Sequence, residues 1–197
     1  MSTLVATILN FNLRTTLEQI ASIQTGVFAK PTAVGEIVYL QARYFDESGQ
    51  LISLLHPDLK TNDVNAKHFL KPGDVLFAAK GTKNFAAVIE DDHLPSVAST
   101  SFFVIRLKNH KVLPEYLAWF MNSASTQQFL KSTALGSSMA SISKGVLEKL
   151  EVLVPTIQTQ HSILSITSHR EKEKQLRQKI EVLQEIIIQK KIINAIK

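Results

Sequence analysis

The C-terminal segment of the chain, from about Gln158 to Ala195, contains neither proline nor glycine. Nothing in this segment interrupts a helix, and a helix of this length measures roughly 55 Å at 1.5 Å per residue. Its apolar residues recur at alternating spacings of four and three, which is typical of the seam of a coiled coil. The seam consists of Leu176, Ile180, Leu183 and Ile187, and we expect Ile193 to continue it. Such a helix either lies back on its own domain or pairs with a second helix, and its length favours pairing.

The preceding residues, 1–155, predict a domain built around a β-sheet. Short apolar runs bounded by turn residues are typical of strands, and they occur at residues 35–41, 75–79, 86–89, 102–107 and 152–154. Helices are expected at residues 15–24, from Pro114, at 127–131 and from Ser143 to Leu150. The first helix follows from the capping-box spacing of Thr15 and Glu18, with Gly26 as its C-terminal stop. The expected fold class is therefore α+β: a mixed domain with a sheet core at 1–155, then a long C-terminal α-helix at 156–197 that pairs as a coiled coil.

The net charge of +5 is unevenly distributed. Residues 1–155 contain 14 Lys and Arg against 13 Asp and Glu, a net of +1, whereas residues 156–197 contain 8 against 4, a net of +4. A basic chain is compatible with a polyanionic partner, but +1 on the domain does not by itself indicate DNA.

Composition also limits the compartment and the chemistry. The absence of cysteine excludes disulfides and thiolate zinc sites. The apolar runs are far shorter than the ~20 residues of a membrane span, and the first residues lack the basic region of a signal peptide. We expect a soluble, cytoplasmic protein that does not enter a membrane.

Sequence motifs of catalysis are absent. There is no Gly-x-x-x-x-Gly-Lys phosphate loop, no Asn-Pro-Pro-aromatic motif of amino-methyltransferases and no glycine-rich dinucleotide turn after a strand. Glu90, Asp91 and Asp92 could hold a divalent cation, but an acidic turn at the end of a strand is the favoured interpretation. The six histidines lack metal-ligand spacing. We expect neither a catalytic residue nor a metal site on this chain.

Several segments, in their order and spacing, resemble the specificity subunit of type I restriction–modification systems. They are residues 17–26, 38–42, 70–77 with Lys80 and Gly81, 102–106, 114–123, Gly136 with Ile142 and Ser143, and 150–155 with Gln160. This resemblance implies a target recognition domain at residues 1–155 that reads one half of a bipartite double-stranded DNA site, and a helical spacer at 156–197. It also implies a chain that is not an enzyme and holds no cofactor, because S-adenosylmethionine and methylation belong to the modification subunit and cleavage to the restriction subunit.

A typical member of this family carries two recognition domains and two helical spacers, whereas this sequence carries one of each and no internal repeat. It therefore resembles a half-length subunit, which we expect to form a homodimer through antiparallel C-terminal helices. The alternative is a stand-alone coiled-coil module that binds DNA or protein without a modification partner.

A sequence-reading domain needs side chains that reach base edges and cations that bind phosphates. Candidate loops span residues 24–30, 42–44 and 80–85. Their candidate DNA-binding residues are Lys30, Arg43, Tyr44, Lys80, Lys83 and Asn84. The two lysines of the third loop suit phosphate or guanine and its asparagine suits adenine, although each could equally be an ordinary solvated loop residue. Residues 136–138 are expected to support the fold or to contact phosphate.

Overall fold

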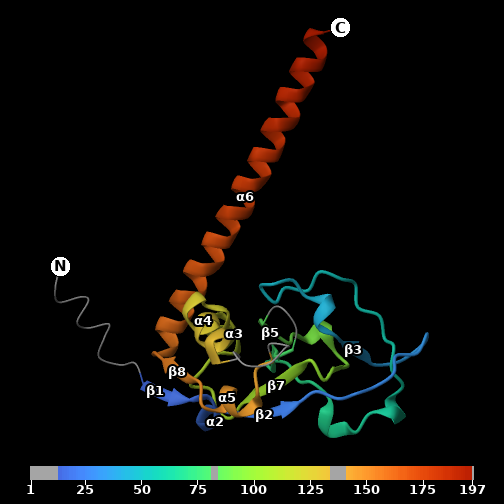
Figure 1. Ribbon diagram of the computed structural model, residues 1–197, viewed down its shortest axis with the longest axis vertical. Coiled ribbons are helices and arrows are strands. Elements are labelled where there is room, and N and C mark those ends of the chain that lie inside the picture. The colour runs from blue at the N-terminus through green and yellow to red at the C-terminus, as the bar shows by residue number, and fades with distance from the viewer. Residues whose placement is uncertain (1–12, 81–83, 134–140, 197) are drawn as a thin grey trace, which may run out of the picture. The chain divides into compact units, whose positions relative to one another are not determined.

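The computed structural model describes residues 13–80, 84–133 and 141–196 (Figure 1). The chain separates into two compact units, the first ending at Ile157 and the second beginning at Gln158. The second unit is formed by the helix α6, Ile157–Ala195, which confirms the long C-terminal helix. The strands all belong to unit 1, so the predicted α+β class is also confirmed.

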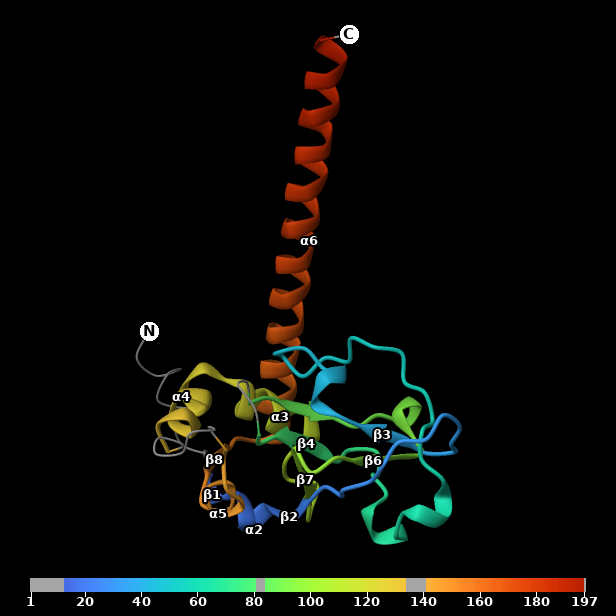
Figure 2. The ribbon, with the colours of Figure 1, turned by 45° about the vertical axis from the view of Figure 1, so that its right-hand side comes forward.

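The largest sheet of unit 1 has four antiparallel strands in the order β2-β7-β4-β5. Their bounds are Ala21–Thr25 for β2, Val75–Ala78 for β4, Ala86–Val88 for β5 and Phe102–Leu107 for β7. Two further pairs of strands flank this sheet: β3 (Val38–Leu40) with β6 (Ser96–Ala98), which are parallel, and β1 (Leu13–Thr16) with β8 (Glu151–Val154), which are antiparallel. Both views place β3 and β6 on one side of unit 1 and β1 and β8 on the other (Figures 1 and 2).

Short helices complete unit 1. They are α2 (Leu17–Ile20), α3 (Pro114–Asn122), α4 (Ala124–Thr133) and α5 (Lys144–Glu148), with 3-10 turns η2 (Ala42–Tyr44), η3 (Thr61–Asp63), η4 (Ala66–His68) and η5 (Asp91–His93). Pro114 occupies the first turn of α3, as its fixed backbone angle favours. Ser143 caps α5 as predicted, because its hydroxyl accepts a hydrogen bond from the Val146 amide at 3.3 Å.

The core of unit 1 is centred on β4, whose four residues are all buried. The turn before β4 is also fixed from inside: Asp74 is 1% exposed and accepts hydrogen bonds from Arg106 Nε at 2.7 Å and Nη2 at 2.6 Å. This contact with the Asp74 carboxylate outweighs burial and raises the pKa of Arg106. The pair therefore ties the start of β4 to β7, its neighbour in the sheet.

The predicted helix at residues 15–24 is wrong in extent. Only Leu17–Ile20 is helical, and Gln19, not Glu18, closes its first turn by accepting a hydrogen bond from the Thr16 amide at 3.3 Å. Beyond Ile20 the chain becomes strand β2, because Ala21 and Ile23 alternate with exposed residues and pair with β7. Long-range pairing therefore overrides a local pattern that also suits a helix.

Gly26 has a different role from the predicted helix stop. It follows β2, and a side chain at this position would clash with the carbonyl oxygen of Ser99. Glycine is needed there because two backbone segments approach closely.

Candidate nucleic-acid interface

The register of the four-stranded sheet brings several loops to one end. Thr25 in β2 pairs with Phe103 in β7, and Ala78 in β4 pairs with Phe102. The end of β4 also pairs with the start of β5. The carboxyl ends of β2 and β4 and the amino ends of β5 and β7 therefore coincide. As a result, the candidate loops at 24–30 and 80–85 leave the sheet at the same end.

The third candidate loop reaches the same end from β3. The Ser99 amide donates to the Leu40 carbonyl oxygen at 2.9 Å, and the Val27 amide donates to the Ala98 carbonyl oxygen at 2.8 Å. The chain segments that follow β2, β3 and β6 are thus joined to one another by backbone hydrogen bonds. Residues 42–44, which follow β3, belong to this group of loops.

Three buried phenylalanines pack together where these loops join the core. Phe45, Phe85 and Phe102 form a cluster with ring centroids 5.7 to 6.0 Å apart, and each is at most 7% exposed. The first follows η2, the second ends the loop after β4, and the third begins β7. Sequence reasoning missed this cluster, and its only signal was that Phe45 follows the 42–44 loop and Phe85 ends the 80–85 loop.

Arg43 and Tyr44 form an ordered pair on the η2 turn. The guanidinium carbon of Arg43 lies 5.2 Å from the Tyr44 ring centroid, and Nη2 donates to the Tyr44 hydroxyl at 3.3 Å. Arg43 is nevertheless exposed. A guanidinium held in this way presents its remaining N–H groups for a phosphate or a guanine edge.

The turn after this pair is held by Asp46. Its Oδ1 accepts hydrogen bonds from the amides of Ser48 and Gln50 at 2.8 and 2.9 Å. Partial burial acts to raise the pKa of Asp46, but the hydrogen bonds from Ser48, Gln50 and Gly49 prevail and lower it. The ionised carboxylate therefore stabilises the turn that returns the chain from Tyr44 to the core.

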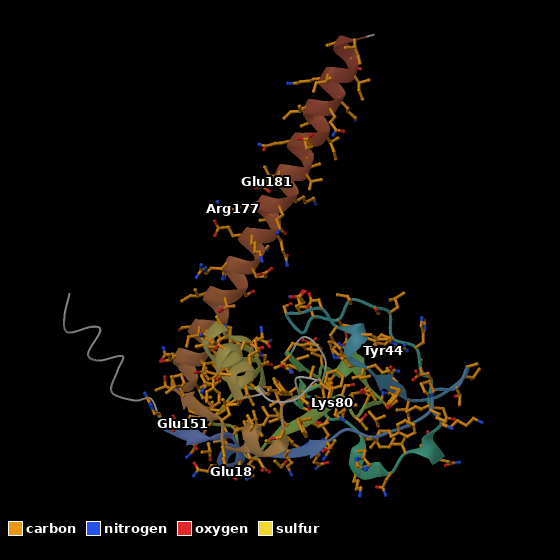
Figure 3. All side chains as sticks on the ribbon, viewed as in Figure 1. Glu18, Tyr44, Lys80, Glu151, Arg177 and Glu181 are labelled. Carbon is orange, nitrogen blue, oxygen red and sulfur yellow. The ribbon has the colours of Figure 1, made fainter. Side chains whose placement is uncertain are left out.

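Lys80 is exposed, and its backbone forms an isolated antiparallel β-bridge with that of Ser141. Figure 3 shows Lys80 and Tyr44 in the part of unit 1 that carries the four-stranded sheet and β3, whereas Glu18 and Glu151 lie in the part that carries β1 and β8. Arg43, Tyr44 and Lys80 are thus the predicted residues that the fold brings to one end of the sheet. Lys83 and the 136–138 segment lie outside the described residues.

Asn84 and Lys30 occupy different environments. Asn84 is half-buried, and its Nδ2 donates to the Ala78 carbonyl oxygen at 2.8 Å, so one of its two N–H groups closes the β4–β5 loop and fixes the amide. Lys30 is exposed, four residues beyond Gly26. Its ammonium is available to bind a phosphate.

The acidic segment after β5 forms a closed turn. Residues 91–93 make up η5, in which His93 Nδ1 accepts a hydrogen bond from the Glu90 amide at 3.1 Å. The imidazole Nε2 lies 3.5 Å from Asp92 Oδ1. Within residues 13–80, 84–133 and 141–196, no group of three or more His, Asp or Glu side chains could hold a metal ion.

The apolar seam of helix α6 is exposed to solvent. Leu176, Ile180, Leu183 and Ile187 are each 50–54% exposed. Because α6 remains helical through Ala195, Ile193 lies roughly 120° around the axis from Ile187. Ile193 thus lies to one side of the line formed by the other four residues, and its part in the seam remains a prediction.

Ile193 belongs to a second apolar stripe of α6. Val182, Ile186 and Ile193 fall within roughly 40° of one another around the axis and are 60%, 45% and 50% exposed. Arg177 lies on neither stripe, roughly 100° around the axis from Leu176, and its Nη2 lies 2.7 Å from Glu173 Oε1 one turn earlier (Figure 3). The exposed isoleucines near the end of α6, which also include Ile188 and Ile192, extend the apolar surface beyond the seam.

Unit 1 thus carries Arg43, Tyr44 and Lys80 at one end of its sheet, and the long helix α6 follows it in the chain. The chain belongs to the type I restriction modification DNA specificity domain family, whose sequence model matches residues 17–182. It is therefore a DNA specificity domain. In the described residues no helix is long and apolar enough to span a membrane.

Solved structures with the same fold agree with this family. An HsdS subunit from Thermoanaerobacter tengcongensis is 20% identical with a TM-score of 0.66, and 87% of this chain aligns with 45% of that one. An S subunit of a type I restriction-modification system from M. genitalium is 14% identical with a TM-score of 0.56, and 83% of this chain aligns with 40% of that one.

A third structure, described as showing complex assembly and conformational transition of the type I R-M system, is 13% identical with a TM-score of 0.62. There 83% of this chain aligns with 39% of the other. The chain thus spans less than half the length of each of these three proteins. A sequence search of curated proteins gave no match.

Proposed function

We propose that this chain is the sequence-reading subunit of a type I restriction–modification enzyme and recognises one half of a bipartite double-stranded DNA target. The observation that carries this proposal is the family match over residues 17–182. The convergence of three loops at one end of the sheet supports it, because Arg43 and Lys80 are exposed there on a rigid base. Rigid placement is what base reading requires.

In this proposal residues 1–155 form the target recognition domain and residues 156–197 the spacer. The chain itself carries no catalysis and no cofactor. S-adenosylmethionine binds to the modification subunit, and cleavage belongs to the restriction subunit. The assembled enzyme acts on DNA in the cytoplasm, and the family match favours this role over a stand-alone coiled-coil module.

Two copies of the chain would pair through the seam of α6. Each of the four seam residues leaves about half of its side chain in water, and a two-fold axis would place the same stripe on both helices. An antiparallel arrangement would set two recognition domains at opposite ends of the paired helices.

The proposal is tested by DNA binding of the full chain assembled with its modification subunit. Lys80→Ala should weaken binding and lower the slope of log K against log salt by about 2, as expected when each of the two copies loses one phosphate contact. Lys131→Ala is the matched control, since Lys131 is also exposed but lies in the last turn of α4. Equal salt slopes for wild type and Lys80→Ala would remove this end of the sheet from the DNA interface.

A further inference from the structure

Phe28 has the highest exposed fraction among the phenylalanines that the structure describes. Its side chain is 79% exposed, against 49% for Phe129, the next highest. A phenylalanine in water forgoes the stabilisation that burial of such a side chain contributes. A single exposed apolar residue is common on protein surfaces, so its significance depends on how the backbone holds it.

The backbone on both sides of Phe28 is fixed to the interior. The Val27 amide donates to the Ala98 carbonyl oxygen at 2.8 Å, and the buried Tyr39 hydroxyl donates to the Val27 carbonyl oxygen at 2.9 Å. The same hydroxyl accepts a hydrogen bond from the Ala29 amide at 3.3 Å. One side chain therefore holds the residue before Phe28 and the residue after it.

The residues of this loop alternate between the interior and solvent. Val27 and Ala29 are partly buried against the cluster formed by Ile37, Tyr39, Leu59 and Val97. Phe28 and Lys30 are exposed instead. Because Val27 and Ala29 pack inward, Phe28 cannot turn into the core without breaking the Tyr39 hydrogen bonds. The loop therefore exposes both a phenylalanine and a lysine to solvent.

The position of the loop indicates what that partner is. The loop leaves the sheet at Gly26, against Ser99, at the end that carries Arg43, Tyr44 and Lys80. An apolar side chain two residues from a cation fits a groove of double-stranded DNA: the cation binds phosphate, and the apolar group contacts the methyl group of thymine, the one apolar group on a base edge.

We propose that Phe28 is a specificity-determining residue that packs against a thymine methyl group in the major groove while Lys30 binds an adjacent phosphate. This inference rests on the proposed DNA-reading function. It assigns base reading to a phenylalanine and only positioning to the neighbouring lysine. Tyr39 is a positioning residue, since it acts through the backbone of the loop.

The test uses the full chain assembled with its modification subunit. A duplex is first selected from a random-sequence library with the wild-type complex, and binding is then titrated with that duplex and with a scrambled one. Phe28→Ala should weaken binding of the selected duplex about tenfold or more and leave the scrambled duplex and the salt slope unchanged. Lys30→Ala should weaken both duplexes and lower the slope by about 2, one contact from each copy of the chain.

Single replacements of thymine by deoxyuridine then locate the contact. One position in each half-site should weaken wild-type binding and cause no further loss with Phe28→Ala. Phe129→Ala, on α4, is the matched control and should bind like the wild type, and thermal melting should show that each variant is folded.

The outcomes separate the inference from the function on which it rests. The role of Phe28 alone is overturned if Phe28→Ala binds the selected duplex as tightly as the wild type. It is also overturned if every deoxyuridine replacement that weakens wild-type binding weakens binding of Phe28→Ala as well. Phe28→Ala that weakens both duplexes equally also overturns it, because Phe28 would then not read sequence. A wild-type complex that selects no consensus removes the DNA-reading function itself.

Discussion

Charge substitution within the seam of α6 should separate the proposed dimer. Ile180 and Ile187 are 54% and 53% exposed, so pairing would bury about half of each side chain, which is worth about 1 kcal/mol per residue. Ile180→Glu with Ile187→Glu removes this contribution from both chains, about 4 kcal/mol in all, which weakens the dimer about a thousandfold. The loss is larger still if the glutamates remain charged within the seam, since a charge that loses water without a partner is costly.

The assay is light scattering or sedimentation at tens of micromolar without partner subunits. The wild-type chain should have the mass of a dimer and the double variant that of a monomer. Ile192→Glu is the matched control: Ile192 is 58% exposed but lies more than about 100° around the axis from either seam residue. A monomeric wild type, or a control variant that dissociates like the seam variant, would refute the pairing.

Three further predictions concern unit 1 and the cofactor. Tyr39→Phe keeps the buried ring but removes both hydrogen bonds to the 27–29 loop, so denaturant unfolding should show a loss of about 1–3 kcal/mol and DNA discrimination should fall with it. The lowered pKa of Asp46 means that its turn stabilises unit 1 above about pH 4, the unfolded value, and that this stabilisation is lost as the pH falls through the folded pKa. Wild type should therefore exceed Asp46→Ala in melting temperature at pH 7, and the difference should shrink below about pH 4; a pH-independent difference would contradict the assignment. Calorimetry should detect no S-adenosylmethionine binding to the isolated chain, and stoichiometric binding would contradict the division of labour between subunits.

The long helix could be predicted from sequence because its evidence is local. A segment of 38 residues without proline or glycine leaves few alternatives, and α6 spans Ile157–Ala195. Beyond Ile187 the isoleucines are dense, so the sequence pattern no longer selects a single face of the helix. Continuing the four-three spacing from Ile187 leads to Lys190 and Asn194, not to Ile193.

The short helix α2 marks where local patterns fail. Leu17, Ile20 and Ile23 recur every three residues and suit a helix, but Ala21 and Ile23 equally suit a strand of period two. Pairing with β7, more than 80 residues away, decides between them. That pairing cannot be predicted from the local sequence.

The candidate interface was predictable only in part. Exposed cations between apolar runs identified Arg43 and Lys80 as loop residues, as the structure has them. Their convergence depends on the register of β2, β4, β5 and β7, which no local pattern encodes. The same holds for Phe45, Phe85 and Phe102, which meet only because the sheet is folded.

The most direct test of the account is the DNA sequence that the full chain recognises together with its modification subunit. Sequencing of methylated bases in DNA treated with this complex would reveal that target. A dyad-related pair of identical recognition domains reads the same half-site on opposite strands, so we predict two identical, inverted half-sites separated by a spacer of fixed length. Methylation without sequence preference, or a target with a single half-site, would contradict the account.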